Sequence, residues 1–178
     1  MPEGRTRVLF VCLANLCRSP MAEAIFRDLV RRSGLSARIE AESAGVAVRH
    51  EGLPPHMGTL AELARQGISS EGIASRCVRV EDLAGFDHVL AADRQVLRVL
   101  KGLRAADVPD SSCVLDLLLR FDPAGGRLDV PDPYFVGGFE EVFAIIERAC
   151  QGLLDHLKKK LPGTTDPDPD PDRREHLC

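Results

Sequence analysis

A cysteine and an arginine stand six positions apart near the start of the chain, between an apolar run and a helical pattern. In VLFVCLANLCRSPMAEAIF (residues 8–26), Cys12 ends the apolar run and Arg18 precedes the pair Ser19-Pro20, which is typical of a helix start. A turn between a strand and a helix directs backbone N–H groups inward, and the helix N-terminus adds partial positive charge. Such a turn is suited to an oxyanion of phosphate size.

The side chains at this turn supply what phosphoryl transfer to sulfur requires. Arg18 carries a planar guanidinium that can bond two phosphate oxygens at once. The positive field of the turn favours the thiolate form of Cys12, which is the nucleophilic form. Ser19 is either a helix cap or a hydroxyl that hydrogen-bonds this thiolate, and Asn15 is suited to a left-handed turn conformation. The pattern C-x5-R-S therefore predicts nucleophilic phosphoryl transfer.

A second group is needed to protonate the oxygen that leaves phosphorus. The candidate is Asp132 in VPDPYF (residues 130–135), and Asp129 is its competitor. Both lie in the long segment 119–136, which exceeds what a plain connection requires and so favours a functional loop. Tyr134 and Phe135 are interpreted as an aromatic wall for an aryl substrate or as core residues, Phe135 especially.

Short apolar runs alternate with helical patterns along the chain. The predicted strands are 7–13, 37–43, 86–92 and 112–118. The predicted helices are a first one ended by Gly34 and those at about 56–66, 93–103 and 137–160. This alternation predicts a three-layer α/β fold, a four-stranded parallel sheet with helices on both faces. Because the carboxyl ends of parallel strands share an edge, Cys12, Ser43 and the start of segment 119–136 should meet there.

Charge and composition narrow the function classes. The chain of 178 residues has a formal net charge of −4, of which residues 162–178 carry −3. That segment alternates Asp with Pro and is predicted to be a disordered acidic tail, leaving one domain at 1–161. The nearly neutral body gives no electrostatic support for nucleic acid. No apolar run is long enough for a bilayer and no secretory signal is evident, so we expect a cytoplasmic protein without membrane contact.

Two motifs give the chain a resemblance to a known family. The sequence resembles the low-molecular-weight protein tyrosine phosphatases, whose signature is close to V-C-x-G-N-x-C-R-S-P and whose acid loop reads D-P-Y. Here these motifs are VCLANLCRSPMAEAIF and DPYF…GGFEEVF, and the similarity covers most of residues 6–160, including ESAGV, ASR and FDHVLAAD. The resemblance implies the family's fold and hydrolysis of phosphotyrosine in proteins by a monomer, without cofactor or metal; no Cys/His grouping has zinc spacing either.

The resemblance also implies residue roles. Cys12 would form a phosphocysteine, Arg18 would bind phosphate and stabilise the transition state, and Asp132 would be general acid and then general base. Cys17 would be able to pair reversibly with Cys12 under oxidants. The residues expected to bind substrate or phosphate are Leu13, Ala14, Asn15, Leu16, Cys17, Ser19 and Tyr134, with Ser43 supporting the loop.

Some positions depart from the family pattern. Ala14 stands where the family usually has Gly, and a positive φ there would cost roughly 1 kcal/mol. A His common before the Ala-Arg element is absent. Phe135 stands where a second Tyr is frequent, and Arg49-His50 occupy a rim where aromatics are common. These departures bear on activity level and substrate preference more than on reaction type.

Three alternative functions follow from the same residues. Related enzymes on this fold remove phosphate from arginine, with Thr at the position of Leu16; the apolar Leu16 favours phosphotyrosine. A thioredoxin-coupled arsenate reductase would need two further cysteines on a mobile segment, where Cys77 is alone. A phosphoprotein-binding module without catalysis is disfavoured by the presence of both Cys12 and Asp132.

Overall fold

The computed structural model describes residues 4–161, so the predicted tail at 162–178 lies outside the described part. The strands are β1 (Thr6–Cys12), β2 (Ile39–Gly45), β3 (His88–Ala91) and β4 (Val114–Leu117). All pair in parallel, in the order β2-β1-β3-β4. The predicted α/β fold with a four-stranded parallel sheet is confirmed. Ser43 does not end β2 as expected, since the strand continues to Gly45.

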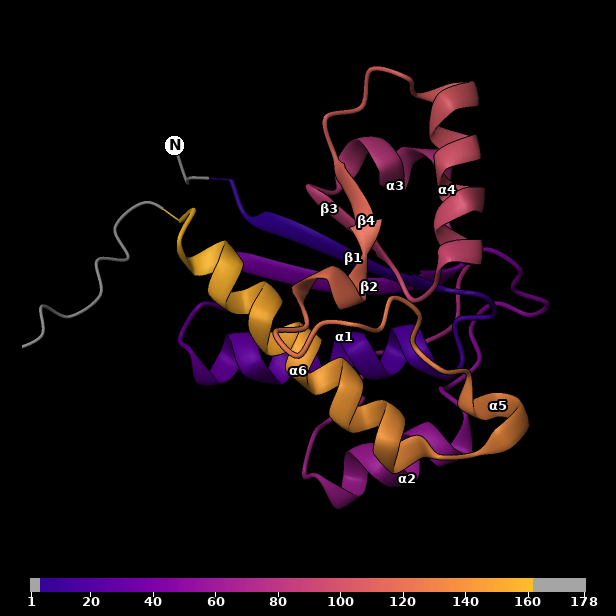
Figure 1. Ribbon diagram of the computed structural model, residues 1–178, viewed down its shortest axis with the longest axis vertical. Coiled ribbons are helices and arrows are strands. Elements are labelled where there is room, and N and C mark those ends of the chain that lie inside the picture. Colours follow the sequence, from indigo (N-terminus) through magenta and orange to yellow (C-terminus); the bar gives the residue numbers. More distant parts are fainter. Residues whose placement is uncertain (1–3, 162–178) are drawn as a thin grey trace, which may run out of the picture.

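Helices cover both faces of this sheet, as predicted (Figure 1). The α-helices are α1 (Arg18–Arg32), α2 (Met57–Arg65), α3 (Val80–Gly85), α4 (Arg94–Asp107), α5 (Pro133–Val136) and α6 (Phe139–Lys158), and η1 (Leu118–Phe121) is a 3₁₀ turn. The long helices α1, α2, α4 and α6 correspond to the predicted ones. The sequence prediction missed α3, α5 and η1, because elements of four to six residues are too short to show a helical period.

Strand β1 separates two hydrophobic cores. Val8 and Phe10 belong to the core shared with α1, α2 and α6, whereas Leu9 and Val11 belong to the core shared with α3 and α4. Successive side chains of a strand point to opposite faces, so a strand buried on both faces must be apolar throughout. Cys12, at the carboxyl end, falls on the α1 side by the same alternation. The alternation thus aims the predicted nucleophile at the start of α1.

Helix α1 begins earlier than its sequence signals suggested. Its first residue is Arg18 and its N-cap is Cys17, which makes no side-chain capping bond. Pro20 is therefore the third helical residue rather than the first, which the fold tolerates because a first-turn N–H has no partner within the helix. Ser19 is not the cap. Its hydroxyl lies within hydrogen-bond distance of Cys12 Sγ and of the Ala44 carbonyl oxygen instead.

The segment 122–132, which connects η1 to α5, is joined to the carboxyl end of the sheet, where Cys12 lies. The Ala92 N–H donates to the Val11 carbonyl at 2.8 Å, and the Val130 N–H donates to the Ala92 carbonyl at 2.8 Å. These bonds extend the pairing beyond the ends of β1 and β3. They hold the segment that carries Asp132 beside the turn that carries Arg18.

No helix within residues 4–161 is both long and apolar enough to cross a bilayer.

Candidate active site

Several carbonyl groups of the turn between β1 and α1 accept hydrogen bonds from other segments, whereas the amides of the turn are unpaired within the described residues. The Cys12, Leu13 and Leu16 carbonyls accept from the N–H groups of Val46, Ala47 and His56 at 3.1, 2.8 and 2.8 Å. Within residues 4–161, no hydrogen bond uses a backbone N–H of residues 13–17 as donor. A run of unpaired amides at a helix N-terminus is the arrangement that binds a phosphate group.

Asn15 sets the curvature of this turn. Its φ of 55° is the only positive value at a non-glycine position in residues 4–161, and Asn tolerates this conformation better than most residues. Its side chain donates to the hydroxyls of Ser19 and Ser43, both at 2.9 Å, and accepts from the Arg76 N–H at 2.9 Å. The buried amide therefore fixes the turn from three directions.

Ala14 does not strain the loop, because its φ is not positive. The family's usual glycine is therefore not needed at this position for a positive φ, and alanine does not carry the strain of roughly 1 kcal/mol that a positive φ would cause. A close approach occurs instead at Gly45, where an added Cβ would lie 2.8 Å from the Leu13 oxygen and 2.9 Å from the Asn15 nitrogen. The glycine that the loop needs is thus on β2.

Cys12 is buried, and its sulfur receives a hydrogen bond. The Ser19 hydroxyl lies 3.0 Å from Cys12 Sγ and 3.2 Å from the Ala44 carbonyl oxygen. A hydroxyl has one proton, so it donates to one of these acceptors at a time. This confirms the contact expected if Ser19 serves the sulfur rather than the helix cap.

Cys17 lines the same cavity as Cys12 and is a poor nucleophile. Burial, followed by the charges of Cys12 and Asp132, raises the pKa of the Cys17 thiol to about 12. At neutral pH it is therefore a thiol and not a thiolate. Both cysteines are free in the structure.

Arg18 is held by two carboxylates and a carbonyl. Its Nη1 donates to Asp93 at 2.7 Å and to the Val130 carbonyl at 3.1 Å, while Nη2 donates to Asp132 at 3.1 Å. Only 6% of the Arg18 side chain is exposed. These three partners fix the guanidinium in place next to the turn, with Asp132 beside it.

The two candidate acids are in different surroundings. Asp132 lines the pocket and caps α5 by accepting from the Tyr134 N–H at 3.1 Å. Asp129 instead accepts from the backbone and guanidinium of Arg94, with the shortest contacts at 2.8 Å. Hydrogen bonds from Arg94 hold the pKa of Asp129 below its ordinary value. Asp129 does not line the cavity that holds Cys12, so of the two carboxyl groups only that of Asp132 is placed to give a proton to a group leaving there.

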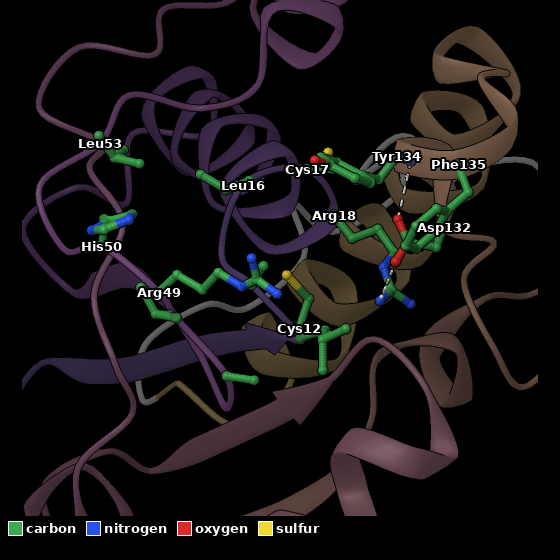
Figure 2. Close-up of a pocket in the computed structure, with 14 residues that line it drawn as sticks. Cys12, Leu16, Cys17, Arg18, Arg49, His50, Leu53, Asp132, Tyr134 and Phe135 are labelled. Atoms are coloured by element: carbon green, nitrogen blue, oxygen red, sulfur yellow. Dashed lines mark hydrogen bonds and ion pairs between the residues drawn. The ribbon is translucent and has the colours of Figure 1, made fainter.

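These residues line a cavity of about 520 Å³ (Figure 2). Its lining residues are Cys12, Leu13, Ala14, Leu16, Cys17, Arg18, Ala47, Val48, Arg49, His50, Leu53, Asp132, Tyr134 and Phe135. The structure thus brings the predicted catalytic residues into one pocket. Asn15, Ser19 and Ser43 are buried and do not line the cavity. No cluster of potential metal ligands occurs in the described residues.

The aromatic pair forms an exposed wall of this cavity. Tyr134 is 55% exposed and Phe135 is 77% exposed. Their ring centroids lie 5.0 Å apart, edge to face, and Tyr134 also contacts His56 at 5.6 Å. Of the two interpretations of Phe135, the core position is therefore wrong, since Phe135 lines the cavity. Helix α5 is a single turn at the edge of the molecule (Figure 1), and Phe135 is exposed there.

Comparison with known proteins identifies the family. The family described as Low molecular weight phosphotyrosine protein phosphatase matches residues 7–163. YfkJ of Bacillus subtilis, named a low molecular weight protein-tyrosine-phosphatase, is 45% identical over 153 residues, covering 86% of this chain and 96% of YfkJ. A protein of the same name from Streptomyces coelicolor is 42% identical, covering 88% and 96%. The chain belongs to the low molecular weight phosphotyrosine protein phosphatase family.

Solved structures agree with this membership. The crystal structure of YfkJ superposes with a TM-score of 0.82 at 42% identity, covering 90% of this chain and 99% of that one. The structure of the drosophila arginine phosphatase DARP gives 0.78 at 33% identity, covering 85% and 97%. The chain is therefore a hydrolase of this phosphatase family, and the DARP likeness keeps the arginine alternative in view.

Two residues that support the phosphatase site were missed by sequence reasoning. Asp93 binds Arg18 and also caps α4; an acidic residue between a strand and a helix at the carboxyl edge was a usable signal. Glu23 is buried and accepts from the Ser43 hydroxyl, and burial raises the pKa of Glu23 despite that bond and the Arg27 ion pair. Its signal was an acid inside the apolar stretch MAEAIF.

Proposed function

We propose that this chain hydrolyses phosphotyrosine in proteins in two steps through a phosphocysteine. The Cys12 thiolate attacks phosphorus, and the bond from phosphorus to the tyrosyl oxygen breaks as Asp132 gives that oxygen a proton. Water then attacks the phosphocysteine, Asp132 takes the proton from this water, and phosphate leaves with the thiolate restored. Arg18 and the amides of residues 13–17 bind the phosphoryl oxygens in both steps.

One observation carries this proposal. The amides of residues 13–17 are unpaired within the described residues, and residues of this turn line one cavity together with the buried Cys12 and with Arg18. The Cys12, Leu13 and Leu16 carbonyls are bonded to other segments, and these bonds hold the turn in place before any ligand arrives. Donors that are held in place favour charge that develops in the transition state. The Ser19 hydroxyl, 3.0 Å from Cys12 Sγ, stabilises the thiolate as attacking and as leaving group.

The lining of the cavity favours an aryl phosphate. Leu16 lines it, and an apolar side chain can contact a phenyl ring but offers no hydroxyl to a P–N bond. Tyr134 and Phe135 supply ring faces and edges for stacking beside Asp132. A phosphoarginine side chain would instead bring a guanidinium next to Arg18. An arsenate reductase would need further cysteines near the site, and Cys77 does not line the cavity.

The deciding assay compares turnover of phosphotyrosine peptides, phosphoarginine peptides and arsenate by the purified chain. We expect turnover of the phosphotyrosine peptides to exceed the other two. Cys12→Ser should abolish turnover and still bind inorganic phosphate. Asp132→Ala should lower kcat by about 10² to 10⁴, and less for substrates with acidic leaving groups, because a good leaving group needs no proton.

Asp129→Ala is the matched control for the acid. It removes a carboxylate from the same segment, so it should lower stability through loss of the Arg94 contacts while kcat stays near that of the wild type. A kcat unchanged by Asp132→Ala but reduced by Asp129→Ala would contradict the acid assignment. Preferred turnover of phosphoarginine would contradict the substrate assignment.

A further inference from the structure

A second arginine points into the phosphate pocket. Arg49 lines the cavity and is exposed. Within residues 4–161 it forms no ion pair or hydrogen bond. Figure 2 shows its side chain extended across the cavity toward Cys12, from the side opposite Arg18. An arginine whose five N–H donors have no protein partner in a pocket is available to an anionic ligand.

The segment that carries Arg49 is fixed to the site by its backbone. Ala47 donates to the Leu13 carbonyl of the phosphate-binding turn at 2.8 Å. The His50 carbonyl accepts from the Ser75 hydroxyl at 2.8 Å, and that hydroxyl also accepts from the Leu53 N–H at 3.0 Å. Arg49 therefore projects from a bonded turn, and less chain entropy is lost when its side chain binds a ligand.

The charges in the site favour a second cation. A phosphate dianion approaches the Cys12 thiolate, while the single positive charge of Arg18 is already shared between Asp93 and Asp132. Even with Asp132 protonated as the general acid, the negative charges outnumber Arg18. The other lining residues near Arg49 are mostly apolar, among them Leu13, Val48 and Leu53. Few groups there other than a ligand could neutralise the guanidinium.

We propose that Arg49 is a second phosphate-binding guanidinium of this enzyme and contacts the phosphoryl group from the side opposite Arg18. The inference rests on the proposed function, because it assigns a further contact to the same substrate. The contact is made to the phosphoryl oxygens and not to the peptide around the phosphotyrosine. It therefore acts equally on a small aryl phosphate and on a phosphopeptide.

The test uses Arg49→Gln, Arg49→Lys and the control Arg98→Gln. Arg98 is an exposed arginine of α4 that does not line the cavity, so its replacement changes net charge by the same amount. Calorimetric titration with inorganic phosphate and turnover of p-nitrophenyl phosphate are measured for each. Losing one charge-assisted contact should weaken phosphate binding and lower kcat/KM by about 10- to 100-fold in Arg49→Gln. Arg49→Lys should fall between, and Arg98→Gln should match the wild type.

Two results overturn the inference. One is that Arg49→Gln binds phosphate as tightly as the wild type. If that variant loses turnover only with acidic phosphopeptides, Arg49 contacts the peptide and not the phosphoryl group. The other is an equal loss in Arg98→Gln, which would reflect net charge alone. A wild type that binds phosphate but hydrolyses no aryl phosphate would contradict the proposed function only, since the titration still compares Arg49 with Arg98. A wild type that binds no phosphate contradicts both.

Discussion

Arg18 is bound by two carboxylates that differ in their other contacts. Asp93 uses one oxygen for Arg18 and the other for the Val96 N–H at the start of α4. Asp132 uses one oxygen for Arg18 and the other for the Tyr134 N–H on a single-turn helix. Asp93 is thus anchored to a long helix, whereas Asp132 is on a short one at the surface. An anchor on a long helix fixes Arg18, while the single turn beside it presents the acid to the cavity.

Asp93→Asn separates the two contacts of this anchor. Asparagine caps a helix about as well as aspartate, so α4 should keep its start, but its NH₂ cannot accept from Arg18. We expect kcat/KM for p-nitrophenyl phosphate to fall about 10- to 100-fold, the value of one hydrogen bond between charged groups, with little change in Tm. Asp93→Ala should lower both. Equal losses of Tm in Asp93→Asn and Asp93→Ala would show that the helix cap and the Arg18 contact are not separable in this way.

At the scale of elements, α6 and η1 approach so closely that no side chain fits between them. A Cβ added to Gly152 of α6 would lie 1.9 Å from the Phe121 carbonyl oxygen. The neighbouring Arg148 binds Asp122 at 3.0 Å, just after η1. A glycine inside a helix costs stability, so its use here follows from the close packing of the segment that leads to Asp132.

Two glycine-to-alanine variants test this packing. Gly152→Ala should lower the free energy of unfolding by about 1–3 kcal/mol, because the backbone of η1 must move. Gly102→Ala, in α4 with open space around it, should raise the free energy of unfolding by about 0.5–1 kcal/mol through better helix propensity. Urea denaturation measures both. A Gly152→Ala variant as stable as the wild type would contradict the close approach.

At the scale of the whole molecule, the pairing of Asp122 with Arg148 links stability to pH. Burial by itself would raise the pKa of Asp122, but hydrogen bonds from Arg148 and the Ala124 N–H outweigh it and lower that pKa. A carboxyl with a lowered folded pKa contributes stability above its unfolded value of about 3.9. That contribution is lost as the pH falls through the folded pKa.

The free energy of unfolding should therefore fall between about pH 5 and pH 2, and part of the fall should depend on this pair. Asp122→Asn should be less stable than the wild type at pH 7 and lose less stability on acidification. Arg148→Gln should show the same flattened profile, because it removes the other partner. Denaturation at a series of pH values measures the slopes. Slopes equal to that of the wild type in both variants would contradict this account.

The sequence predicted the parts of the molecule that depend on local pattern. The apolar run before Cys12 and the spacing to Arg18 predicted the turn, and the alternation of strands and helices predicted the sheet. The helix cap by Asp93 is a local contact, but the contact of Asp93 with Arg18 and the position of Arg49 across the cavity depend on how separate segments meet, which no local pattern encodes. The sequence left Phe135 between the cavity wall and the core, because an apolar residue type does not tell whether a four-residue helix is buried or exposed.

The single proton of Ser19 connects the two halves of the proposed reaction. While Cys12 carries a free negative charge, the hydroxyl can point at sulfur; once that sulfur holds a phosphoryl group, the hydroxyl can rotate to the Ala44 oxygen. Asn15 keeps donating to the same oxygen throughout. The Ser19 hydroxyl then has an acceptor before, during and after turnover, so one bond rotation replaces any rearrangement of the backbone.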